Sequence, residues 1–82
     1  MEPNKGFMIA RAQEADAILT GPIMQEVFAT TEEAFMREWR RAETTQQREM
    51  CWAKVTGLEE VKRQLRRIVG KGEHASRQPD ER

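Results

Sequence analysis

The 82-residue chain has one cysteine, no tyrosine and only three prolines, and its 14 basic residues balance its 14 acidic ones. A single cysteine excludes an internal disulfide, and with one histidine it supplies too few ligands for a closed zinc site. Zero net charge means that any attraction to nucleic acid or anionic lipid has to be local. No stretch approaches the ~20 apolar residues of a membrane-spanning helix, and the polar N-terminus does not resemble a signal peptide. We therefore expect a cytoplasmic protein without a metal or cofactor.

Residue pairs that perform catalysis are also missing. Cys51 falls on an apolar helical face and His74 near a chain end, so they do not form a nucleophile and base. The adjacent glutamates at 32–33 and 59–60 point to different sides of their helices, so neither pair presents two carboxylates to one substrate. No glycine-rich loop follows a strand, which leaves no phosphate-binding turn. We do not expect an enzyme.

The clearest pattern in the chain is one long amphipathic helix in its second half. Apolar residues between 51 and 69 recur at steps of three and four, which is the spacing of one helical face. Thr44 and Gln47 have the types and spacing of a capping box at the start of this helix. Gly70, just beyond the last periodic residue, is suited to end it. The pattern predicts a helix over about 45–69.

Two further helices are predicted before residue 43. Residues 6–19 carry a short apolar stripe supplied largely by alanines, so this helix is expected to be weakly anchored. Thr20 and Gly21 interrupt the pattern, and Pro22 fits the first position of a new helix because its missing N–H would be unpaired there. The second helix is predicted over about 22–42. Thr30 begins a second capping signal, so a break near this residue is the alternative.

The short connection between the second and third helices predicts an antiparallel hairpin, on which the first helix packs. We expect an all-α fold with one domain over residues 1–74 and a disordered tail over 75–82, which lacks large apolar residues. The aromatic stripe of the second helix, including Trp39 in the core, would face the stripe of the third. Gly57 would let the two backbones approach closely, because glycine within a helix otherwise costs about 1 kcal/mol relative to alanine.

A basic cluster near the end of the third helix is one candidate binding surface. Its members are Lys62, Arg63, Arg66, Arg67 and Lys71. Such a cluster can contact the phosphates of a nucleic acid or an acidic protein surface. The simpler interpretation is that these cations complement the helix macrodipole and that Glu59 pairs with Arg63 four residues later. No aromatic residue interrupts the cluster, which argues against single-strand binding by stacking.

An apolar rim near the hairpin loop is the other candidate surface. Met36, Met50 and Trp52 lie at the edge of the predicted stripes, where they would be exposed. Trp52 packing against the first helix is the alternative. The rim predicts a protein partner or self-association, and no small-molecule substrate is evident.

Two segments of the chain carry a resemblance to known proteins. PIMQEVFATTEEAFMREW (22–39) has an aromatic-rich helical pattern, and REMCWAKVTGLEEVKRQLRRIVGKGE (48–73) has an early tryptophan, then a basic run and a glycine pair. Together they resemble small helical-hairpin proteins of tailed phages and prophages, often encoded among head-morphogenesis and DNA-packaging genes. The resemblance implies a non-enzymatic virion or assembly component that binds a head, portal or packaging protein, either as a single chain or as an oligomer. The alternative function is a small nucleic-acid-binding or regulatory protein that uses the basic cluster.

Overall fold

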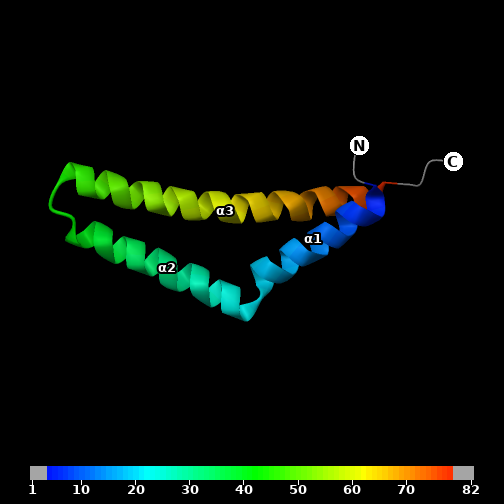
Figure 1. Cartoon of the computed structure of the whole chain (residues 1–82), viewed down its shortest axis with the longest axis horizontal. Coiled ribbons are helices and arrows are strands. Elements are labelled where there is room, and N and C mark those ends of the chain that lie inside the picture. The colour runs from blue at the N-terminus through cyan, green and yellow to red at the C-terminus, as the bar shows by residue number, and fades with distance from the viewer. Residues whose placement is uncertain (1–3, 79–82) are drawn as a thin grey trace.

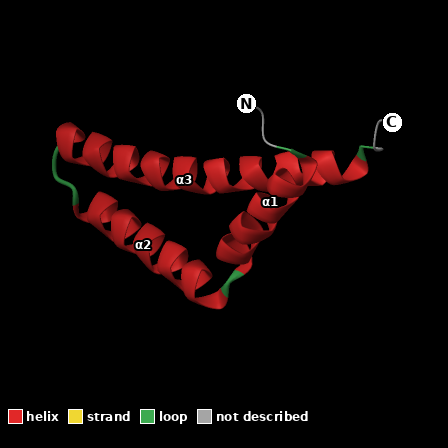
Figure 2. Cartoon of the chain, turned by 45° about the vertical axis from the view of Figure 1, so that its right-hand side comes forward, coloured by secondary structure: helices red, strands yellow, loops and turns green. Residues whose placement is uncertain are grey.

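The computed structural model describes residues 4–78, which form three α-helices and, within that range, no strand. These are α1 (Lys5–Thr20), α2 (Pro22–Arg41) and α3 (Thr45–Arg77). The predicted all-α class is confirmed. Helices α1 and α2 follow one another in a bent line and meet at a corner that stands away from α3, which runs past both in the opposite direction (Figures 1 and 2). The molecule extends over 63 × 25 × 18 Å.

The starts of the helices follow local sequence signals. Asn4 caps α1 by accepting a hydrogen bond from the backbone N–H of Phe7 at 2.7 Å. Pro22 is the first residue of α2, and α2 is continuous through residue 30, so the alternative break is absent. The predicted capping box of α3 is confirmed. The backbone N–H of Gln47 donates to Thr44 Oγ1 at 3.1 Å, and the Gln47 side chain accepts from the Thr44 N–H at 3.2 Å.

The predicted end of α3 is wrong. The helix passes through Gly70 and Gly72 with neither residue at positive φ, and it continues to Arg77. Residues 75–77, placed in the expected tail, are therefore helical, Gln78 is the C-cap, and residues 79–82 lie outside the described residues. The physical reason is a contact with α1, because packing outweighs the cost of about 1 kcal/mol per helical glycine.

The closest packing in the fold joins α1 to the C-terminal half of α3 through small residues. Ala12 and Ala15 of α1 are buried, as are Gly72 and Ala75 of α3. A Cβ atom on Gly72 would collide with the Cβ of Ala12 and would lie 2.9 Å from the carbonyl oxygen of Met8. The alanine-rich first helix is thus closely packed where weak anchoring was expected, since its small side chains allow the two backbones to approach.

Two contacts between α2 and α3 place a lysine ammonium over an aromatic ring. Lys62 Nζ lies 5.4 Å from the centre of the buried Phe28 ring, and Lys54 Nζ lies 5.8 Å from that of Phe35. Trp39, predicted to lie in the core, is 45% exposed. Within the described chain, no large side chain is fully buried. The apolar stripes of α2 and α3 therefore cover one another only in part.

The role predicted for Gly57 is also wrong. A Cβ atom at this position would have no neighbour within 4 Å, so Gly57 does not bring two backbones together. The glycine that does so is Gly72, on a different pair of helices.

Candidate functional site

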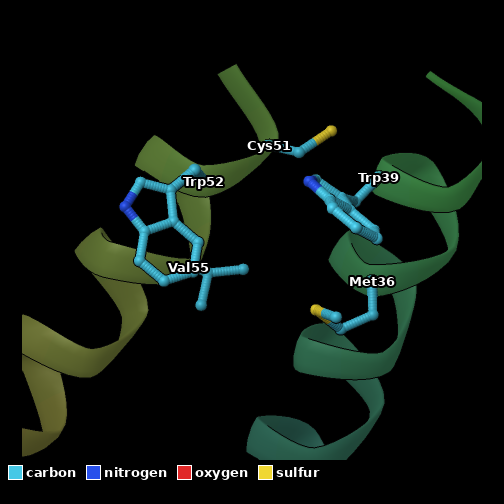
Figure 3. Close-up of a pocket in the computed structure, with 5 residues that line it drawn as sticks. All are labelled: Met36, Trp39, Cys51, Trp52 and Val55. Atoms are coloured by element: carbon cyan, nitrogen blue, oxygen red, sulfur yellow. The ribbon is translucent and has the colours of Figure 1, made fainter. Parts of the chain in front are cut away.

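An apolar groove opens between α2 and α3 close to the loop that joins them. Its volume is about 140 Å³. The residues that line this loop-end groove are Met36, Trp39, Cys51, Trp52 and Val55. The two indoles belong to facing helices and stand on either side of the groove, with Val55 between them and Met36 next to Trp39 (Figure 3). No residue of this lining carries a charge.

The walls of the groove are more exposed than is usual for such side chains. Trp52 is 67% exposed and Met36 is 36% exposed, whereas Cys51 is buried. Tryptophan buries a large apolar area when it is covered, and its indole N–H can still find a hydrogen-bond partner at an interface. The groove therefore presents apolar area that a partner can cover.

The predicted apolar rim is divided between two sides of α3. Met36 and Trp52 line the loop-end groove, but Met50 lines a separate shallow groove with charged and polar neighbours such as Arg41 and Lys54. Successive helical residues are rotated by about 100°, so positions 50 and 52 point to opposite sides of Cys51. The sequence interpretation missed Trp39 and Val55 as lining residues. The helical period alone would have separated Met50 from Trp52 once Cys51 was placed against α2.

An ion pair joins the two helices beside the groove. Lys54 Nζ donates to Glu38 Oε2 at 2.9 Å. This hydrogen bond, and secondly the charge of the same carboxylate, raises the pKa of Lys54 above its ordinary value. Both side chains are about half exposed, so the pair contributes little free energy in salt.

The five residues of the predicted basic cluster do not form one surface. Lys62 is turned toward α2, where its side chain is only 20% exposed and lies 3.7 Å from carboxylates of both Glu32 and Glu59. Arg63 pairs with Glu60 at 2.5 Å, so the predicted pair with Glu59 is wrong. The other three members, Arg66, Arg67 and Lys71, are exposed, and no ion pair within residues 4–78 occupies them.

The residues considered for catalysis and metal binding lie apart. Cys51 and His74 are separated by about 35 Å along α3, and the His74 ring contacts the side chain of Gln78 at 2.9 Å. Across residues 4–78 there is no group of three or more metal-ligating side chains. In the same part of the chain, no helix is both long enough and apolar enough to cross a membrane.

Comparisons of the chain with protein families, curated proteins and solved structures found no match.

Proposed function

We propose that this protein is a non-enzymatic interaction module that binds a protein partner through the loop-end groove. The observation that carries the proposal is the pair of exposed tryptophans, Trp39 and Trp52, on facing helices around an uncharged groove. Tryptophan is among the residues most enriched at the energetic centres of protein interfaces. Its exposure here leaves apolar area in water that association would cover.

The incomplete contact between α2 and α3 supports the same proposal. The contacts between these helices include two lysine–aromatic pairs and the ion pairs Lys54–Glu38 and Lys62–Glu32, with no large fully buried side chain among the described residues. An apolar side chain inserted between Trp39 and Trp52 would complete the hairpin seam predicted from the two stripes. A domain of this length buries a smaller fraction of its surface than a larger domain does, so a partner or a second copy would add stability.

The phage resemblance supplies the proposed setting. A small module without catalytic residues fits a virion or head-assembly component that docks on a head, portal or packaging protein, in the host cytoplasm or in the virion. The elongated shape supports this role, because a 63 Å module can join components that are not in direct contact.

The test compares two substitutions of matched chemistry. Trp52→Glu places a charge in the groove, whereas Met50→Glu places one at an exposed apolar position on the other side of α3. Both variants should keep the helical circular dichroism of the parent. We expect Trp52→Glu to abolish association and Met50→Glu to preserve it.

Association is measured in two ways. Light scattering over a range of concentrations reports self-association, and a photocrosslinking amino acid at position 52 or at position 50 reports other partners. Crosslinks should form from position 52 and not from position 50. A chain that stays monomeric and gives the same crosslinks from both positions would remove the groove as the binding site.

A further inference from the structure

The C-terminal half of α3 has a basic face turned away from α1. Steps of four, three and four residues place Arg63, Arg67, Gly70 and His74 along one line of the helix. Gly72 and Ala75, which contact α1, lie on the other side. The side chains that form this outer basic face are Arg63, Arg66, Arg67, Lys71, His74 and Arg77.

The length of α3 argues against the explanation that these cations only complement the helix macrodipole. Cations complement the helix macrodipole only within about the last turn of a helix. Because α3 extends to Arg77, its last turn contains His74 and Arg77 and not the arginines at 63, 66 and 67. These arginines lie in the body of the helix, where a different reason for their charge is needed.

The outer basic face is a local positive charge on a neutral molecule. Residues 62–77 contain six lysines or arginines and one acid, Glu73, so the rest of the chain carries the compensating negative charge. Glu73 lines a groove with Ala12 and Gln13 of α1 and, four residues before Arg77, lies at the edge of the outer basic face. Arg66, Arg67 and Lys71 are exposed without an ion pair inside the described range.

The spacing of the face suits a regular polyanion. Side chains four residues apart are displaced by about 6 Å along the axis, and the face from Arg63 to Arg77 is about 21 Å long. A nucleic-acid duplex presents one charge per about 1.7 Å of its axis, so several phosphates lie within that reach. At the centre of the face, a Cβ on Gly70 would meet nothing within 4 Å, which leaves room for a phosphate backbone to approach the helix.

The residue types that this face lacks exclude several classes of ligand. Protein interfaces have an apolar centre, membrane-surface helices insert apolar side chains, and single strands stack on aromatics. The outer basic face has no apolar side chain and no Phe, Tyr or Trp, because its members are basic side chains around a glycine. We propose that it binds the phosphate backbone of double-stranded nucleic acid without reading base sequence, at the opposite end of α3 from the loop-end groove (Figure 1).

The test measures binding of the full chain to 30-base-pair DNA duplexes of two unrelated sequences by fluorescence anisotropy, over a range of salt. With about four phosphate contacts, the logarithm of the affinity should fall with that of salt at a slope of about −3 to −4. The two duplexes should bind alike. The test variant replaces the exposed, unpaired members together: Arg66→Gln, Arg67→Gln and Lys71→Gln. It should bind at least tenfold more weakly at low salt, with the slope reduced by about 3.

A matched control removes the same charge elsewhere. It replaces three arginines near the end of α2: Arg37→Gln, Arg40→Gln and Arg41→Gln. This control should keep the slope of the parent, and circular dichroism should show that both variants are folded. Equal losses in both triple variants, or an unchanged slope in the first, would overturn the proposal.

Binding of other polyanions tests whether the ligand of the outer basic face is a nucleic-acid duplex. Tighter binding to single-stranded DNA, to polyglutamate or to phosphatidylserine vesicles than to duplex would also overturn the proposal. Trp52→Glu should bind duplex as the parent does, so failure of the groove and failure of the basic face are separate results.

Discussion

Three glycines lie inside α3, and their surroundings differ. Gly57 and Gly70 have open space where a side chain would be, whereas Gly72 is in contact with α1. Glycine is the least favourable helical residue after proline, so the two open positions lower the stability of the helix and only the third has a packing reason.

Substituting these glycines should therefore give opposite results. Gly72→Ala would collide with Ala12 and the Met8 carbonyl and should lower the free energy of unfolding by about 1–3 kcal/mol through overpacking. Gly57→Ala meets no atom and should raise it by about 0.5–1 kcal/mol. Urea unfolding followed by circular dichroism measures both. A neutral Gly72→Ala would contradict the tight contact between α1 and α3.

At the scale of elements, α3 is central because both other helices pack on it. Its start depends on the capping box, so Thr44→Ala should destabilise the chain by about 1 kcal/mol. Thr45→Ala is the matched control, because Thr45 is exposed and lies outside the box. Urea midpoints compare the two, and an equal effect of both substitutions would argue against the cap.

The ion pair between Lys54 and Glu38 predicts that the stability of the fold depends on pH in the alkaline range. Because the fold raises the pKa of Lys54, the folded state holds this proton more tightly than the unfolded state does. The stabilisation is complete below the ordinary pKa of 10.5 and is lost as pH rises through the higher folded value. Parent stability should thus fall in this range more than that of Glu38→Gln. Urea unfolding from pH 9 upward measures it, and parallel curves would exclude the linkage.

At the scale of the whole molecule, the elongated shape separates the two candidate surfaces. The radius of gyration is 17.6 Å, whereas a compact chain of this length would have one of about 12 Å. The loop-end groove and the outer basic face lie toward opposite ends of α3 (Figure 1).

Their effects should therefore be separable, since sites far apart without shared partners act additively. Association through the groove should be insensitive to salt, because it covers apolar area, whereas duplex binding should weaken steeply with salt. Light scattering at low and high salt, with and without a duplex, distinguishes the two. Loss of both activities on one substitution, in a chain that stays folded, would show that they share a site.

The sequence by itself determined the local features. Three helices, the Thr44 capping box and the interruption at Gly21–Pro22 follow from residues within about four positions of one another, and the structure contains all three. The exposure expected of Trp52 is also observed. These features depend on short-range hydrogen bonds and on the helical period, which can be predicted from the spacing of residue types in the sequence.

Only the tertiary structure decided what the helices do together. Gly72 lies within a helix because Ala12 packs against it, and Lys62 is unavailable as a surface charge because Phe28, Glu32 and Glu59 surround it. Trp39 is exposed because α3 leaves the apolar stripe of α2 partly uncovered. Each outcome depends on the distance and angle between helices remote in sequence, and these are fixed by packing rather than by local pattern.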